Sequence, residues 1–247
     1  MINKIKQLIN EFRANYRKID SKLVELENQG RELEWAHIYH DSIRGKKWLE
    51  ELPLNVGRWA GNYSFFYVLN RILMDYKPKS VLDLGLGESS KFISTYLDNY
   101  LLESRHIIVE QNEDWIKSFQ EKVLLSKRSV IVHCPLKEIE IKGFRSNSYD
   151  GFKEKITEKF DLYIIDGPFG SDRFSRYDIV SIVDKMKLED QFIIMMDDTN
   201  RKGEQDTLSD ILNSLNTKNI KFYLGEYKGT KAVTLIVSEN YKFATTM

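Results

Sequence analysis

Hydrophobic residues recur every three or four positions through residues 1–30. This spacing predicts a helix with one apolar face. The recurring positions are Ile2, Ile5, Leu8, Ile9, Phe12, Tyr16, Ile19, Leu23 and Leu26. Gly30 follows the last of them and is a suitable residue to end a helix. We therefore expect residues 1–30 to form an N-terminal amphipathic helix.

Beyond Pro78, apolar runs alternate with helical stretches, which is typical of a parallel sheet with helices on both faces. The apolar runs are Ser80–Leu84, His106–Glu110, Val130–Cys134, Leu162–Asp166 and Phe192–Asp197. The helical stretches are Ser90–Leu101, Glu113–Leu125, Ser175–Lys187 and Thr207–Leu215. Two last runs, Lys221–Tyr227 and Ala232–Ser238, are joined by four residues. So short a connection leaves room only for an antiparallel hairpin.

These patterns predict an α/β fold with an N-terminal helical extension. The fold would be a Rossmann-like doubly wound sheet of five parallel strands plus a C-terminal antiparallel hairpin, seven strands in all. Residues 35–62 are aromatic and irregular, and we expect residues 31–62 to form an aromatic lid or substrate segment. Tyr63–Tyr76 has the pattern of a buried helix and ends before Pro78. It would open the main domain, residues 63–247.

Composition excludes several classes of protein. The 37 basic and 37 acidic residues leave no net charge, so we expect no nucleic-acid partner. A single Cys, Cys134, excludes an internal disulfide, and with four His it excludes a Cys-rich zinc site. The sequence has no apolar run of about eighteen residues, as a spanning helix needs, and no apolar signal stretch near its start. We expect a cytoplasmic protein.

The N-terminal helix is basic up to Lys22, so the rest of the chain is net acidic. Its apolar face would pack on its own domain or on a second copy of the chain, forming a homodimer. Peripheral contact with an anionic membrane is the alternative.

Ligands of open α/β sheets bind beyond the carboxyl ends of the strands. After the first strand, Gly85 and Gly87 allow a tight turn, and Ser89 and Ser90 open a helix whose free amides suit a carboxylate. Glu110 ends the second strand and can accept hydrogen bonds from both ribose hydroxyls of an adenosine. The turn and the acid together predict a site for a nucleoside cofactor.

Two features favour S-adenosylmethionine over NAD as that cofactor. Ser90 stands where the dinucleotide pattern has a third glycine, and the terminal hairpin is foreign to dehydrogenases. Over Tyr63–Ser238 the chain resembles class I S-adenosylmethionine-dependent methyltransferases. The resemblance rests on residues 83–87, Glu110, residues 160–168 and the final hairpin, with Ser89 in place of the usual third glycine.

The resemblance implies a cofactor site at the strand ends. The five residues from Asp83 to Ser90 in the set below would surround the methionine part of the cofactor. Glu110 and Gln111 would hold the ribose, and Pro135 and Leu136, after the third strand, would lie by the adenine. The full set is Asp83, Gly85, Gly87, Ser89, Ser90, Glu110, Gln111, Pro135, Leu136 and Asp166.

Three carboxylates end the fourth and fifth strands: Asp166, Asp197 and Asp198. Like charges this close repel one another, and a divalent cation with oxygen ligands would offset them. The arrangement resembles metal-dependent O-methyltransferases, including those that act on antibiotic sugars. This implies all three as Mg²⁺ ligands, with Asp166 and Asp198 as catalytic residues. Alternatively, Asp166 binds the cofactor amine, and Asp198 or Thr199 caps the next helix.

The segment after the fourth strand predicts the acceptor. Arg173, Arg176 and Tyr177 suit an anionic or phosphorylated sugar. Asp166, or His37 or His40 from the N-terminal segment, could remove the hydroxyl proton. Two segments also resemble methyltransferase-like proteins of bacterial surface-polysaccharide pathways: residues 57–62 and residues 166–170.

The expected function is therefore S-adenosylmethionine-dependent O-methylation of a sugar or other glycan-pathway acceptor, with assistance from Mg²⁺. Three alternatives stay open. They are an O- or N-methyltransferase of small molecules without a metal, an NAD-binding oxidoreductase, and a non-catalytic scaffold subunit that binds the cofactor.

Overall fold

A seven-stranded sheet forms the centre of the computed structural model, which describes residues 2–247 and the side chains of residues 4–247. Its strand order is β3-β2-β1-β6-β7-β9-β8. The strands are β1 (Ser80–Leu84), β2 (Arg105–Glu110), β3 (Ser129–His133), β6 (Leu162–Ile165), β7 (Ile193–Met196), β8 (Phe222–Lys228) and β9 (Ala232–Ser238). The first five are parallel, and β9 runs antiparallel between β7 and β8. The predicted fold class is confirmed.

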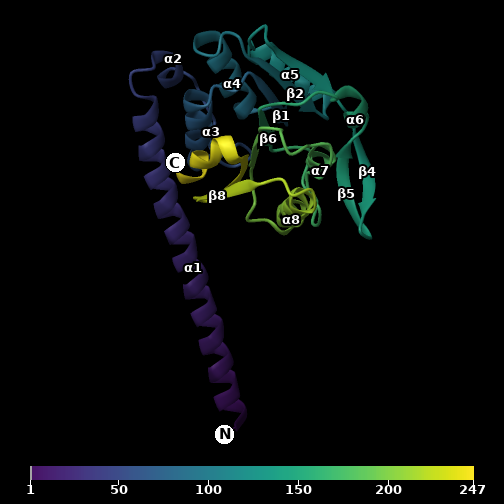
Figure 1. Cartoon of the computed structure of the whole chain (residues 1–247). Coiled ribbons are helices and arrows are strands. Elements are labelled where there is room, and N and C mark those ends of the chain that lie inside the picture. Colours follow the sequence, from purple (N-terminus) through teal and green to yellow (C-terminus); the bar gives the residue numbers. More distant parts are fainter. Residues whose placement is uncertain (1) are drawn as a thin grey trace.

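Helices cover both faces of this sheet (Figure 1). They are α3 (Tyr63–Asp75), α4 (Glu88–Asn99), α5 (Glu113–Lys122), α7 (Asp178–Val183) and α8 (Lys202–Thr217), with the short helices α2 (Lys47–Glu50), α6 (Phe152–Lys155) and η1 (Glu239–Thr246). Neighbouring residues of β1 point to opposite faces, so Val81 packs with α3 and α4 while Leu82 packs with α7 and α8. The core therefore has two layers, and the ends of the strands lie between them.

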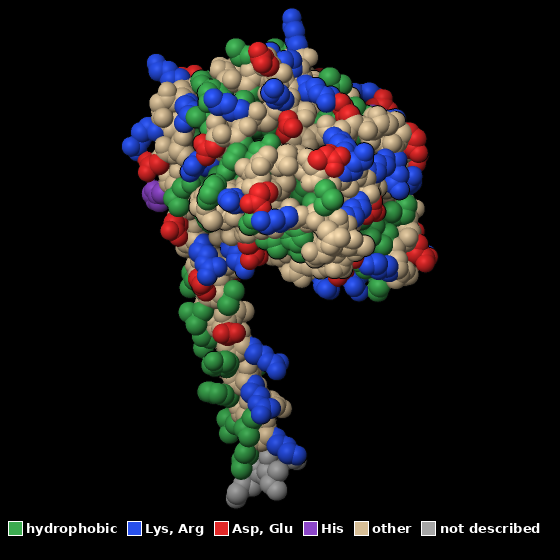
Figure 2. Space-filling model, viewed as in Figure 1, with side chains coloured by type: hydrophobic (Ala, Val, Ile, Leu, Met, Phe, Trp, Pro, Cys, Tyr) green, Lys and Arg blue, Asp and Glu red, His purple; other side chains and the backbone are tan. Residues whose placement is uncertain are grey.

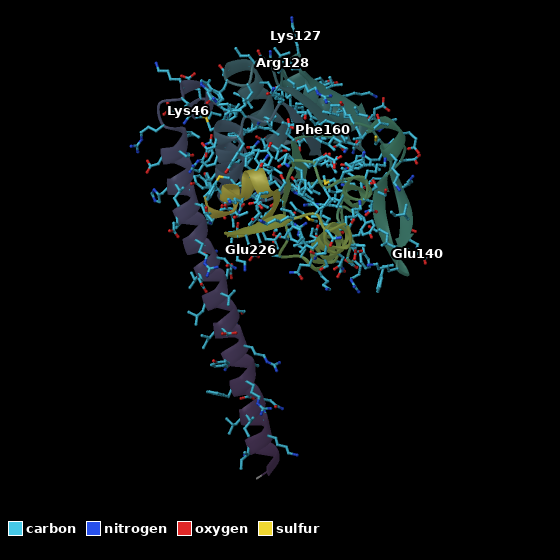
Figure 3. The ribbon with its side chains drawn as sticks, in the orientation of Figure 1. Lys46, Lys127, Arg128, Glu140, Phe160 and Glu226 are labelled. Carbon is cyan, nitrogen blue, oxygen red and sulfur yellow. The ribbon has the colours of Figure 1, made fainter. Side chains whose placement is uncertain are left out.

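The structure contains a hairpin that the sequence analysis did not predict. It consists of β4 (Leu136–Ile141) and β5 (Phe144–Tyr149), paired antiparallel in a sheet of their own. Lys142 and Gly143 have φ of 52° and 83°, as the two-residue turn of a hairpin requires. The hairpin lies at the opposite side of the domain from the N-terminal helix (Figure 1), and Glu140, labelled in Figure 3, lies near its tip.

The N-terminal helix α1 (Ile2–Ile43) is 42 residues long and continues past Gly30, where we expected it to end. The Gly30 site is open to solvent, so a helix can pass through it at a cost of about 1 kcal/mol relative to alanine. Trp35, Tyr39 and Ile43 then pack on the main domain and stabilise the continuation. The expectation that the chain is irregular from residue 35 is therefore wrong as far as residue 43. Met1, the first residue of the predicted segment 1–30, lies outside the described residues.

The first half of α1 projects away from the domain (Figure 1). Its second half is fixed by contacts with α3 and with the β8–β9 turn. Glu32 accepts hydrogen bonds from Tyr63 N (2.7 Å) and Thr230 N (2.9 Å), and Trp35 Nε1 donates to Lys228 O (2.8 Å). Among the described residues, no helix is both long enough and apolar enough to cross a membrane.

Candidate functional site

The turn between β1 and α4 forms one wall of a cavity of about 870 Å³ at the carboxyl ends of the strands. Gly85 has φ of +114°, which favours glycine, and a Cβ there would lie 3.3 Å from Gly167 N in the loop after β6. Glycine therefore lets the turns after β1 and β6 approach closely. Gly85 and Gly87 both line the cavity, in agreement with their predicted place.

Asp83 lies beneath this turn, where its side chain is completely buried. Its Oδ2 accepts hydrogen bonds from Ser89 Oγ (3.1 Å) and Ser90 Oγ (2.7 Å). Ser89 also lines the cavity, whereas Asp83 and Ser90 do not belong to its described lining. Asp83 and Ser90 thus hold the turn in shape from behind the cavity wall.

Glu110 enters the cavity from the end of β2, and backbone amides fix its carboxylate. Oε2 accepts from Leu86 N (3.0 Å), while Oε1 accepts from Gln111 N (2.9 Å) and Asn112 N (2.8 Å). Burial raises the pKa of Glu110, and the three amides partly oppose that rise. Gln111 lines the cavity beside Glu110. A nucleoside hydroxyl can reach the lone pairs that the amides leave free.

Asp166, Asp197 and Asp198 converge as predicted, with carboxylate oxygens within 4.8 Å of one another. Asp166 follows β6 and Asp197 follows β7. These two strands are neighbours with matched ends, so their acids meet. Both oxygens of Asp197 and Oδ1 of Asp198 are buried, and none of the described residues donates a hydrogen bond to them.

Arg176 is the main counter-charge of this cluster. Its Nη2 lies 3.1 Å from Asp166 Oδ1 and 2.8 Å from Asp198 Oδ2, and its Nη1 donates to Asp197 O (3.0 Å). Arg176 lines the cavity, but its side chain is buried against the acids. From the sequence we expected Arg176 to bind the acceptor, and its ion pairs with the acids were not predicted.

Lys231 is a further counter-charge of the cluster and was not predicted from the sequence. Its Nζ lies 3.6 Å from Asp197 Oδ2 and 3.5 Å from Asp198 Oδ1. It belongs to the β8–β9 turn, which is brought beside Asp197 because β9 pairs with β7. The position of Lys231 could have been inferred from the predicted antiparallel hairpin, because this hairpin returns the chain to the edge of the fifth parallel strand, β7.

Burial and charge together change the acidity of the cluster. Loss of water around Asp166 raises its pKa to about 8, Arg176 opposes that rise, and Asp197 reinforces it. The pKa of Asp197 is also raised, first by burial and then by the neighbouring Asp198. Asp166 can therefore hold or release a proton near neutral pH.

Aromatic and basic side chains form the outer part of the cavity. The loop before α3 contributes Arg58 and Trp59, and the side chain of Trp59 is 90% exposed. Phe169 and Arg201 line the cavity beside the acid cluster. Trp115, on α5, also lines it and donates from Nε1 to Leu86 O (2.8 Å). The aromatic composition of residues 31–62 had pointed to Trp59, but nothing had pointed to Trp115.

Several predicted residues lie elsewhere in the described structure. Pro135 and Leu136 lie at the start of the β4–β5 hairpin, outside the cavity lining. Arg173 is paired with Asp206, and Tyr177 donates to Asp210 (2.9 Å). His37 and His40 are also absent from the described lining, and His40 borders a smaller cavity of about 330 Å³. Their assigned roles stay predictions.

Comparison with known proteins finds similarity at the level of solved structures. No protein-family model and no curated protein matches the chain. An O-methyltransferase from Bacillus cereus in complex with S-adenosylhomocysteine is 14% identical, covers 82% of this chain and 91% of its own, and gives a TM-score of 0.46.

Two further solved structures are similar to a comparable degree. An O-methyltransferase from Streptomyces achromogenes involved in tomaymycin synthesis, in complex with S-adenosylmethionine, is 12% identical (83% and 88% covered, TM-score 0.44). A precorrin-6y C5,15-methyltransferase from Geobacter metallireducens is 13% identical (77% and 95% covered, TM-score 0.46). At TM-scores below 0.5 these likenesses assign no activity. The Rossmann-like fold of the chain, five parallel strands followed by an antiparallel hairpin, is established by its own strand order.

Proposed function

We propose that the chain is an S-adenosylmethionine-dependent O-methyltransferase that acts on a hydroxyl of a sugar or sugar-containing acceptor. One observation carries the proposal: a single cavity joins the glycine turn and Glu110 to a carboxylate whose pKa is raised to about 8. The first part suits a nucleoside cofactor, and the second suits proton removal from an acceptor.

The cofactor would lie along the β1–α4 turn. Glu110 offers its free lone pairs to the ribose hydroxyls, and the free amides at the start of α4 suit the methionine carboxylate. Gly85 and Gly87 bring the backbone close to the ligand, since neither has a side chain to keep it away.

S-adenosylmethionine, when bound, supplies a methyl group on a positively charged sulfur. The acceptor hydroxyl must lose its proton as its oxygen bonds to that methyl carbon. The bond between this carbon and sulfur breaks at the same time, so that neutral S-adenosylhomocysteine leaves, and Asp166 accepts the proton on a carboxylate oxygen. A pKa near 8 suits this role because the group exchanges protons near the working pH. Arg176 orients the carboxylate through the 3.1 Å ion pair. The remaining rate gain comes from alignment of the two reactants in the cavity.

The acid cluster fits Mg²⁺, which prefers oxygen ligands. Asp166, Asp197 and Asp198 would hold the ion, and the buried oxygens without donors at the last two support this. The ion would stabilise negative charge that develops on the acceptor oxygen. Arg176, Lys231 and Arg201 already bring three positive charges to the same acids. Those ion pairs favour the alternative, a reaction that needs no metal.

Chelation separates the two forms of the proposal. If Mg²⁺ assists, turnover falls after treatment with a chelator and returns with added Mg²⁺, while calorimetric binding of S-adenosylhomocysteine is unchanged. If turnover survives exhaustive chelation, the basic side chains Arg176, Lys231 and Arg201 neutralise the acids without a metal.

The outer cavity supports a sugar acceptor. The exposed ring of Trp59 and that of Phe169 offer flat apolar faces, on which a sugar ring can stack. Arg58 adds positive charge, which suits a phosphate or carboxylate of the acceptor. Arg201 adds a second charge: its Nη1 lies 3.1 Å from Asp198 Oδ2, but its side chain is still 52% exposed and can also reach the acceptor. These four residues replace Arg173 and Tyr177 as our proposed acceptor contacts.

The test is calorimetry with S-adenosylmethionine, followed by an acceptor panel of free, phosphorylated and nucleotide-linked sugars. Asp166→Asn should lower kcat by about 100-fold or more, with cofactor affinity changed only a few-fold. Asp172→Asn, a matched change at an exposed acid in the same loop, should leave kcat unchanged. Absence of cofactor binding overturns the proposal. Binding without transfer to any acceptor would favour the scaffold subunit.

A further inference from the structure

The projecting half of α1 exposes a continuous apolar stripe. Phe12 is 71% exposed and Leu23 60%, and Ile5, Ile19 and Leu26 are exposed as well. Figure 2 shows apolar side chains gathered along the edge of the helix that faces away from the domain, and Figure 3 shows this half standing clear of other side chains. An exposed apolar surface of this extent marks an interaction site.

The stripe follows a heptad repeat, in which positions a and d carry the apolar residues. The a positions are Ile9, Tyr16, Leu23 and Gly30, and the d positions are Ile5, Phe12, Ile19, Leu26 and Leu33. Strict alternation of three and four residues is the period of a left-handed coiled coil, and it gives a narrower stripe than packing on a globular core needs. The repeat stops where Trp35 begins to pack on the domain.

The charges along this half are divided by sign. Residues 4–22 contain six basic and two acidic residues, whereas residues 23–34 contain four acidic residues and one basic residue. A parallel pair of helices would place basic against basic and acidic against acidic. An antiparallel pair places each basic half beside an acidic half, which is favourable at both ends.

We infer that α1 forms an antiparallel coiled coil with a second copy of the chain, with Tyr16 opposite the partner's Ile19. In this register the e positions, which directly follow the d positions, pair across the two helices. Lys6 faces the partner's Glu27, and Arg13 faces the partner's Asp20.

Other registers are less favourable. A shift by one heptad in one direction places Arg13 opposite the partner's Arg13, and a shift in the other direction places Asp20 opposite the partner's Asp20. Both shifts bring like charges together. The overlap runs from Ile5 to Gly30, about 40 Å at 1.5 Å per residue. It uses only the part of α1 that projects from the domain, so the two domains lie at opposite ends.

A membrane surface suits the stripe less well. Glu25, Glu27, Glu32 and Glu34 lie along the half nearest the domain, and an anionic bilayer would repel them. Membrane contact also favours basic residues on both sides of a broad apolar face, which this helix has only in its first half.

Light scattering and sedimentation of the full chain measure the oligomeric state. We expect a dimer at micromolar concentration. Lys6→Glu with Arg13→Glu should weaken it about tenfold or more, because the four cross-helix pairs become repulsive. Adding Asp20→Lys and Glu27→Lys should restore it. The control, Lys4→Glu with Lys18→Glu, makes the same charge change at positions that face solvent in the coil and should leave the dimer intact.

Disulfide cross-linking measures the orientation. A variant with both Ile9→Cys and Leu26→Cys should cross-link between chains on oxidation, because position 9 lies opposite the partner's position 26. Each single variant should not, since its two copies lie about 25 Å apart along the coil. Cross-linking of the single variants indicates a parallel pair and overturns the inference. A chain that is monomeric in solution also overturns it, whether or not it binds anionic vesicles.

Discussion

At the scale of single residues, Glu110 is held by three backbone amides, and its raised pKa has a consequence for binding. As pH falls from about 7.5 to about 5, Glu110 takes up a proton earlier than an ordinary glutamate and loses an acceptor for the ribose. Affinity for S-adenosylhomocysteine, measured by calorimetry, should therefore fall over this range.

Glu110→Gln separates this effect from others. It should weaken binding about tenfold at pH about 7.5, since one carboxylate oxygen becomes a donor, and it should abolish the dependence on pH. Glu113→Gln, at an exposed position on the first turn of α5, is the matched control and should behave as the unaltered chain. An unchanged pH profile in Glu110→Gln would place the titrating group elsewhere.

Which residues could be predicted depends on how directly the backbone places them. Gly85, Glu110 and Asp166 follow strands of a parallel sheet, so their meeting at one edge could be derived from the sequence alone. Arg176 could be noticed as a charge near the site, but its burial against Asp198 depends on how a loop folds back. No repeating pattern in the sequence encodes that path.

At the scale of elements, Glu32 joins three parts of the fold. From α1 it accepts from Asn62 Nδ2 (2.8 Å) and Tyr63 N at the start of α3, and from Thr230 in the β8–β9 turn. Glu32→Ala should lower the free energy of unfolding, measured by denaturant titration, by about 1–3 kcal/mol. It should also raise KM, because Thr230 precedes Lys231 of the acid cluster.

Glu34→Ala is the control for this prediction. Glu34 lies on the same helix and is exposed, so its removal should change stability by less than about 0.5 kcal/mol. Equal effects of the two variants would mean that helix propensity, rather than the contacts of Glu32, accounts for the loss.

Elements were predictable where packing requires a periodic pattern. The buried strands and the α3 helix have such patterns, and the structure confirms them. The β4–β5 hairpin was missed although Leu136, Ile139 and Ile141 occur among charged residues, because it packs beside the main sheet and not within it. The end of α1 was wrong because Trp35 and Tyr39 extend the helix through tertiary contacts that outweigh Gly30.

At the scale of the whole molecule, the proposed dimer predicts that helix content depends on concentration. An isolated helix of this length is marginally stable in water. Dilution below the dissociation constant should therefore unfold residues 4–27, all of which are exposed. Far-ultraviolet circular dichroism should show this loss, while the near-ultraviolet signal of the packed aromatic core should stay constant. With Lys6→Glu and Arg13→Glu, the loss should begin at higher concentration. Helix content independent of dilution would contradict coupled folding and association.

The positions of the four tryptophans allow ligand binding in the cavity to be followed by intrinsic tryptophan fluorescence. Trp59 stands in solvent at the mouth and Trp115 is 44% exposed on the wall, whereas Trp35 and Trp48 pack against the core. Occupation of the cavity should therefore alter the emission of the first two and spare the other pair. Emission changes that persist in the Trp59→Phe variant would come from Trp115 and indicate binding at the nucleoside end of the cavity. Emission changes that disappear in this variant would come from Trp59 and indicate binding at the acceptor end. Each half of the reaction site thus carries a separate intrinsic fluorophore.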